Sequence, residues 1–269
     1  DRPLAMSFKG NVPFAALAAQ TSAQGFVVNG SAAVDIRIEG TATAPSVTGT
    51  ITTDGARVTD VRRNLTINNL AATISFNRDV ATISRLTGAM SGGGTLSGSG
   101  TIGINPGAGF PADLSLTLNR ATYVDGTLFS TQASGTVTLK GPVLTSPMLA
   151  GTITLDKSAI TIPERLPASL TEIDIKHENA PPAVRRQDAE LRADQGGDGT
   201  SSSIGLDLQI NAPSGIFVRG RGVDAELNGN LTVRGTAASP QVSGGFTMRR
   251  GRLEILTRRL DFTNGDITF

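Results

Sequence analysis

Apolar and polar residues alternate along most of this chain, and this alternation constrains its fold more than any other feature. In residues 34–38, 114–118, 204–210 and 252–255, every second position is apolar and the positions between are polar, small or charged. Successive side chains of a β-strand point to opposite faces, so the pattern predicts strands with one apolar and one polar face. Clusters of Gly, Pro, Asn and Asp divide the chain into strands of ordinary length.

Composition indicates a large sheet whose apolar face is thin and aliphatic. Of the 269 residues, 38% are hydrophobic, only 4% are aromatic, and 32 are glycine. A sheet of about 15 or more strands cannot stay flat, so it curls or splits into two packed sheets. Two packed sheets usually recruit large aromatic side chains to their shared core, and this chain has few of them. We therefore predict an all-β fold in which a long antiparallel sheet curls into a trough with an apolar interior.

One sequence phrase occurs three times and predicts a long internal repeat. Residues 40–49, 141–151 and 235–244 each begin with glycine, continue to a proline and end on a second glycine, and an alternating strand follows. Proline cannot donate to a strand ladder and belongs at a strand start or an edge, while glycine permits close backbone approach. We interpret the three phrases as corners between strands, in repeat units of several strands each. Residues 1–269 are thus predicted to form a single elongated β domain.

Two segments interrupt the strand pattern. Residues 13–20, which begin with proline, predict a short helix. Residues 176–203 are polar, charged and rich in helix- and strand-breaking residues, so they predict a solvated insertion.

The sequence offers little for catalysis. His177 is the only histidine and there is no cysteine, so a Ser-His-Asp triad, thiol chemistry and a zinc site are all disfavoured. Residues 98–103 satisfy G-x-G-x-x-G, but a dinucleotide site needs a helix directly afterwards, and the following residues 105–111 read NPGAGFP. We therefore expect these glycines to be small strand positions. The sequence predicts no enzyme, no catalytic residue, no cofactor and no metal site.

Charge is balanced overall but basic near the C-terminus. The net charge is +1, so no general field attracts nucleic acid, and the scarcity of aromatic residues disfavours single-stranded nucleic acid. Eight arginines lie between residues 216 and 260. They could attract anionic lipid head groups or an acidic partner, or they could simply solvate an outer face and protect its edge.

Residues 212–269 resemble the conserved C-terminal region of the TamB family, in the AsmA-like group. The most specific pieces are VRGRG at 218–222 and FTNGDITF at 262–269, and the Gly-Pro-Gly phrases resemble the family's degenerate upstream repeats. The resemblance implies a periplasmic protein of diderm bacteria, anchored in the inner membrane by an N-terminal helix. It implies a β-sheet rolled into a taco-like groove with a hydrophobic interior.

The same resemblance implies two roles. Family members are implicated in moving phospholipid towards the outer membrane. They also partner TamA, the Omp85-family outer-membrane barrel of the translocation and assembly module, in outer-membrane protein assembly. We expect the membrane anchor, and the final segment that meets TamA, to lie outside the present sequence.

The predicted mechanism is a passive conduit for phospholipid acyl chains. Exposing each CH₂ to water costs about 0.8 kcal/mol, and a continuous apolar floor removes most of that barrier while the head group stays in water. Strand parity identifies the candidate lining residues. They are Ile36, Ile38, Ile51, Ile67, Ile74, Ile102, Leu116, Leu118, Ile153, Leu206, Leu208, Ile210, Leu227, Val233, Phe246, Leu253 and Ile255.

Two alternatives remain open at the level of sequence. The trough could cradle nascent outer-membrane β-strands as a chaperone, adding them at its open edges. It could also be a structural β-solenoid stalk, in which the same apolar residues form an ordinary packed core. Whether the apolar face is filled by side chains or left open distinguishes the stalk from the other two.

Overall fold

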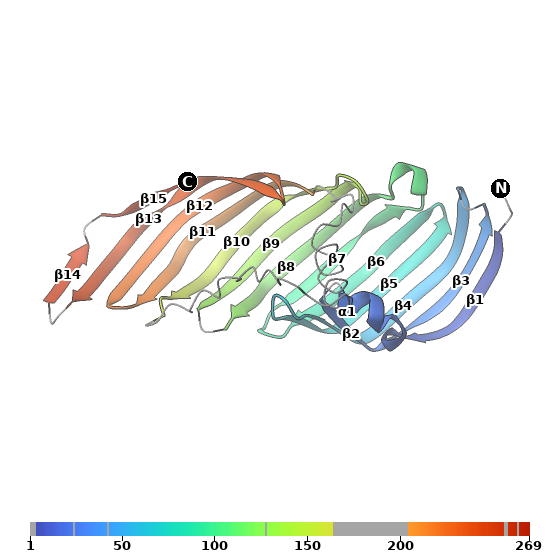
Figure 1. Ribbon diagram of the computed structural model, residues 1–269, viewed down its shortest axis with the longest axis horizontal. Helices are drawn as coiled ribbons and strands as arrows, with labels where there is room; N and C mark the ends of the chain where they lie inside the picture. The colour runs from blue at the N-terminus through green and yellow to red at the C-terminus, as the bar shows by residue number, and fades with distance from the viewer. Residues whose placement is uncertain are drawn as a thin grey trace, which may run out of the picture.

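A single sheet makes up almost the whole structure, a computed structural model that describes residues 4–23, 25–41, 43–126, 128–163, 204–255, 258–262 and 264–269. Within these ranges all 15 strands join one sheet, and the strands stand side by side along the long axis of the molecule (Figure 1). The predicted all-β class is confirmed.

Sequence order and spatial order nearly coincide in this sheet. The path runs from β1 through β3 to β14, with β2 paired to β4 and β15 paired to β13. The strands are β1 (Leu4–Pro13), β2 (Phe26–Asn29), β3 (Ser31–Gly40), β4 (Pro45–Asp60), β5 (Leu65–Arg78), β6 (Val80–Met90), β7 (Thr95–Gly103), β8 (Pro111–Asp125), β9 (Phe129–Pro142), β10 (Met148–Thr161), β11 (Gly205–Gly220), β12 (Val223–Thr236), β13 (Ser239–Ile255), β14 (Arg258–Phe262) and β15 (Asp266–Thr268).

The prediction of a wholly antiparallel sheet is wrong at one place, because β10 and β11 pair in parallel. Alternation reports which face a side chain occupies and carries no information about strand direction. Parallel neighbours start at the same end of the sheet, so the chain must return from the end of β10 to the start of β11. The predicted polar insertion, Lys176–Ser203, belongs to that connection and lies outside the described residues.

The three Gly-Pro-Gly phrases lie at turns between neighbouring strands, from β3 to β4, β9 to β10 and β12 to β13, and that they mark repeat units stays a prediction. The second glycine of each phrase lies inside the strand that follows the turn. Gly151 shows why glycine is needed there. Its φ is +154°, and a Cβ at this position would meet the backbone carbonyl oxygen of Thr136 on the adjacent strand.

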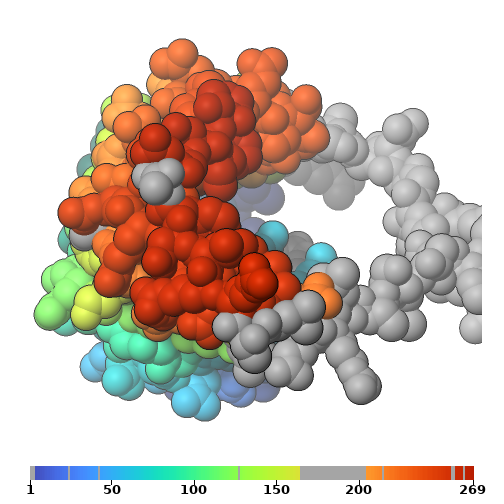
Figure 2. Space-filling model, turned by 90° about the vertical axis from the view of Figure 1, so that its left-hand side faces the viewer, coloured from blue at the N-terminus to red at the C-terminus, as the bar shows by residue number. Residues whose placement is uncertain are grey.

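Irregularities near the middle of many strands bend the sheet. A β-bulge adds a residue to one strand, bends that strand and increases its local twist. Viewed end-on, the bent strands form a C around a hollow (Figure 2). The register shifts fall between Thr53 and Ala56, Asn68 and Ala71, Ile83 and Leu86, Leu118 and Ala121, Leu155 and Lys157, and Ala212 and Ile216.

The helical content is small. The helix predicted after Pro13 is confirmed as a 3-10 turn, η1 (Phe14–Leu17), followed by α1 (Ala18–Ala23), and a second 3-10 turn, η2 (Pro106–Ala108), precedes β8. None of the helices in the described ranges has the length and apolarity needed to cross a membrane. The glycines of the G-x-G-x-x-G match lie in β7, as expected.

A buried carboxylate fixes the turn between β4 and β5. Asp60 is only 7% exposed. Its carboxylate accepts hydrogen bonds from the Arg63 backbone N–H at 3.1 Å and from the Arg63 guanidinium at 2.7 Å. The hydrogen bond from the Arg63 side chain lowers the pKa of Asp60 below its ordinary value of 3.8.

Substituting Asp60→Asn should therefore destabilise the protein near neutral pH, and the penalty should disappear in acid. A carboxylate whose folded-state pKa is lowered stabilises the fold above its unfolded-state pKa and loses that contribution as pH falls through the folded-state value. Urea unfolding of both proteins at neutral pH and well below pH 3.8 measures the difference. An equal gap at both pH values would show that the ionised group contributes nothing.

Candidate functional site

Strand register places the apolar residues of distant segments on one continuous face. Directly opposite residues of neighbouring strands share a face, so each face can be followed from strand to strand through its residue pairs. One such line, which we call the central row, crosses nine strands from β3 to β11 and contains only aliphatic residues and one glycine. It consists of Val34, Ile51, Ile74, Ile83, Gly100, Leu114, Leu139, Leu149 and Leu206.

The structure places all the predicted lining residues on the face of the central row, which we call the apolar face. All are half-buried except Ile255, which is 50% exposed. Ile51, Ile74 and Leu206 lie in the central row itself. Leu116, Leu208 and Val233 lie in the row beside it, and Leu118, Ile153 and Ile210 in the next.

The remaining predicted residues lie towards the rims and the two ends of the apolar face. Each pairs with residues of the same face on its neighbouring strands. Ile36 pairs with Phe8, Ile38 with Met6, Ile67 with Val58, Ile102 with Ala81, Leu227 with Ile216, Phe246 with Gly229, Leu253 with Val223, and Ile255 with Arg258.

The apolar face lines the hollow. In Figure 1, α1 lies in front of the sheet, which is the side towards the hollow in Figure 2. A Cβ on Gly30 would lie 3.3 Å from Ala56 Cβ and 3.7 Å from Phe14 Cδ2. The helical segment therefore begins on the face of Ala56, which pairs with Leu70 of the apolar face.

The apolar side chains do not form a filled core. Among the described residues, none of the large side chains is fully buried, and most of the buried hydrophobic residues are alanines such as Ala56, with 0% exposure, and Ala212, with 1%. In a closed sandwich the inward leucines and isoleucines would be the most buried residues. Here they are half-buried, as expected for neighbours that converge on a concave surface over which the described residues form no second layer.

The opposite face is polar and solvated. Thr117 and Thr136, which are paired across β8 and β9, share a hydrogen bond of 3.1 Å. Ion pairs join Lys9 to Asp35 at 2.7 Å and Lys140 to Asp113 at 3.1 Å. These contacts lie on exposed side chains, where solvent screens the charges and each contact contributes little to stability. They keep this face in water and so fix which face turns towards the hollow.

The C-terminal arginines form a network of alternating charge. Arg250 pairs with Glu226 at 2.6 Å, and Arg252 with Asp224 at 3.2 Å. Further pairs join Arg219 to Asp224, Arg234 to Asp207, and Arg259 to Asp261. This arrangement favours the solvated-face interpretation of the basic cluster.

A cavity of about 260 Å³ opens on the apolar face near the middle of the sheet. Ser99 of β7, which lies between the glycines at 98 and 100, and Ser115 of β8 belong to its lining. We call it the leucine pocket. Its apolar lining comes from β6, β8, β9 and β10 and consists of Ile83, Leu86, Leu114, Leu116, Val137, Leu139 and Leu149.

Of the residues that line this pocket, only Leu116 is among the lining residues predicted from the sequence. The alternation contained a signal for Leu114, which shares its parity. Leu86 was hidden because the bulge between Ile83 and Leu86 reverses the parity within β6. Leu139 and Leu149 flank a turn, so only their pairing brings them together.

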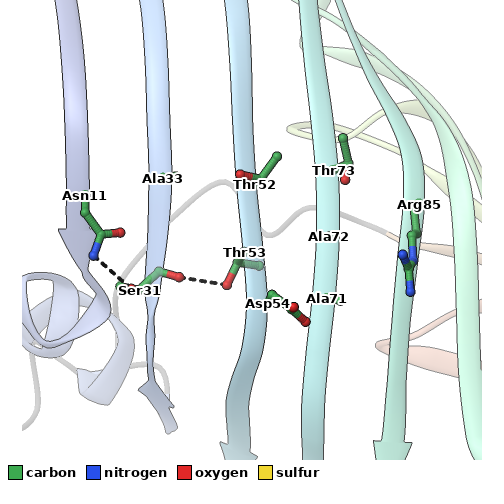
Figure 3. Close-up of a pocket in the computed structure, with 10 residues that line it drawn as sticks. All are labelled: Asn11, Ser31, Ala33, Thr52, Thr53, Asp54, Ala71, Ala72, Thr73 and Arg85. Atoms are coloured by element: carbon green, nitrogen blue, oxygen red, sulfur yellow. Dashed lines mark hydrogen bonds between the residues drawn. The ribbon is translucent and has the colours of Figure 1, made fainter.

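A second cavity, of about 420 Å³, has a different chemical character (Figure 3). It is lined by hydroxyl, amide and charged groups together with small alanines, and it spans β1 to β6. The Asn11 amide donates to the Ser31 hydroxyl at 3.1 Å, and the Thr53 hydroxyl donates to the Ser31 carbonyl at 2.8 Å. Asp54 and Arg85 complete its polar character. Such a lining is unsuited to a hydrocarbon chain.

Chemistry that requires clustered titratable groups finds no support in the described ranges. They contain no group of three or more His, Cys, Asp and Glu residues that could hold a metal. His177 lies outside the described residues. That the protein is not an enzyme therefore stays a prediction.

Comparison with known proteins identifies one family. A family model described as the TamB C-terminal domain matches residues 84–269, which is more than half of the chain and includes β7 to β15. No curated protein and no solved structure gives a significant match.

Proposed function

Because the chain belongs to the TamB family, we propose that its apolar face is one section of a periplasmic conduit that carries phospholipid between the inner and outer membranes. The acyl chains lie against the apolar face, and the head groups stay in the water at the open side of the hollow. The family match supports a broad role in outer-membrane biogenesis, and the open apolar face carries the finer proposal.

The single observation that carries this proposal is an apolar face that is continuous and that the described residues leave unfilled. The central row crosses nine strands without a charged or polar residue. Nine strands span eight spacings of about 4.8 Å, or nearly 40 Å. A structural stalk would need the same residues to bury one another, and none of the large ones in the described ranges is fully buried.

The free energy of transfer explains why such a face moves lipid without an active site. Exposing an acyl chain of about sixteen carbons to water costs on the order of 10 kcal/mol at about 0.8 kcal/mol per CH₂. The apolar face replaces that water with hydrocarbon at each step along the sheet. Because neighbouring positions offer similar aliphatic contacts, advancing by one strand changes the free energy little.

A photocrosslinking amino acid placed at Leu208, and separately at Gln209, tests the proposal. Leu208 is half-buried on the apolar face, whereas Gln209 is exposed on the polar face of the same strand. We expect phospholipid adducts at position 208 and none at 209, with bound lipid also visible in the native mass. Equal labelling at the two positions, or none at either, would refute the conduit.

A second candidate is a chaperone for outer-membrane β-strands acting with TamA. It is favoured by exposed apolar side chains on the apolar face, since Met6 of β1 is 56% and Phe8 48% exposed. Such side chains offer contacts to the apolar side of a client strand. The same crosslinkers distinguish this role, because a chaperone would give protein adducts at position 208 and at positions 6 and 8.

A further inference from the structure

The leucine pocket makes the apolar face non-uniform at one place. Along most of the central row each strand presents a branched side chain, but β7 presents Gly100, and Gly98 lies in the neighbouring row. A Cβ on Gly98 would lie 3.2 Å from Leu86 Cδ2 and 3.4 Å from Leu116 Cδ1. The leucines of β6 and β8 thus lean towards positions where β7 has no side chain, and the pocket lies between the central row and the row beside it.

The pocket fits a single acyl chain. An aliphatic cavity of about 150 Å³ binds one benzene, so about 260 Å³ corresponds to roughly ten carbon atoms. Its lining spans β6 to β10, so the pocket runs across the strands. An elongated apolar trough of this volume matches part of one extended hydrocarbon chain lying across the strands.

We infer that the leucine pocket is a discrete resting seat for one acyl chain, an inference that rests on the proposed conduit. A chain seated there contacts aliphatic side chains of two neighbouring rows, one on either side of it, whereas elsewhere it contacts the apolar face from one side only. Lipid thus accumulates at the pocket and passes quickly over the rest of the face. Transport then proceeds through one preferred binding site, which the lipid reaches along the flanking rows of the apolar face.

Crosslinking in the unmodified background tests the seat without relying on a variant that could fail to fold. A photocrosslinker is placed at Leu116 in the pocket, at Leu208 on the same row but away from the pocket, and at Thr117. Thr117 is the matched control, because it lines a depression of about 320 Å³ on the polar face behind β7. The probe is dipalmitoyl phosphatidylglycerol in vesicles, supplied below one lipid per protein.

With lipid limiting, we expect at least about fivefold more adduct at position 116 than at 208, a ratio equivalent to about 1 kcal/mol, and none at 117. A second measurement fills the pocket with Val137→Phe. It should lower the adduct at 116 while the adduct at 208 persists.

The outcomes separate the two proposals. Equal adduct at 116 and 208, or an unchanged yield at 116 in a folded Val137→Phe protein, would overturn the seat and leave the conduit standing. Absence of lipid at both apolar positions, or equal labelling at 117, would overturn the seat and the conduit together.

Discussion

Replacing Ile153 by aspartate is expected to reduce bound phospholipid by at least about tenfold while the protein stays folded. Ile153 lies on the apolar face between Gly135 and Ile210. A carboxylate there would have to lose water when an acyl chain passes, at a cost of several kcal/mol. Without lipid, the open hollow leaves the carboxylate hydrated, so the loss of a half-buried isoleucine costs only about 1–2 kcal/mol of stability.

The neighbouring residue supplies the control. Thr152 is exposed on the polar face, paired with Thr136 and Gln209, so Thr152→Asp should retain its lipid. Bound lipid is quantified after purification, and stability by urea unfolding. If Ile153→Asp instead lost upwards of about 5 kcal/mol of stability, as burying an unpaired charge in a filled core would require, the apolar face would be a packed interior and the conduit would be wrong.

The second large effect concerns the repeated glycines. Gly151→Val is expected to lower the free energy of unfolding by roughly 3 kcal/mol or more. Its φ of +154° is strained for valine, and the new Cβ would meet the Thr136 carbonyl oxygen and the Val137 Cα. Both belong to strand backbone, which can move only by separating β9 from β10. Chemical denaturation followed by circular dichroism measures the loss.

A substitution at Gly55 tests a positive φ at a position without a close backbone contact. Gly55 also has a positive φ, +73°, but a Cβ there would meet no atom within 4 Å. Asparagine tolerates this left-handed conformation, so Gly55→Asn should cost less than about 1 kcal/mol. Losses of similar size in both variants would show that strand-to-strand contact at Gly151 is unimportant.

Much of the fold could be read from alternation because side-chain parity is a local property of a strand. The interpretation of Gly98 and Gly100 as strand residues and the short helix after Pro13 both depend on nearby residues, and both are confirmed. The parallel pairing of β10 and β11 could not be predicted in this way. It depends on where the chain returns after a long connection, which alternation does not record.

The candidate site was only partly predictable for a related reason. Bulges reverse parity within a strand, so a count along the sequence loses the face after each one. Leu86 follows such a shift in β6, and Ala121 follows another in β8. The apolar lining of the leucine pocket comes from β6, β8, β9 and β10. Which of these side chains meet next to the glycines of β7 is known only once the strand pairing is known.

Alternation along the chain is enough to establish that it forms strands with one apolar and one polar face, because each side chain's direction follows from its position along an extended backbone. The tertiary structure is needed to show that the apolar faces of all strands turn to the same hollow, and that the described residues leave this hollow unfilled. It is also needed to locate the leucine pocket. Those outcomes depend on strand pairing and on bends at mid-strand bulges, and both are set by contacts between residues far apart in the chain.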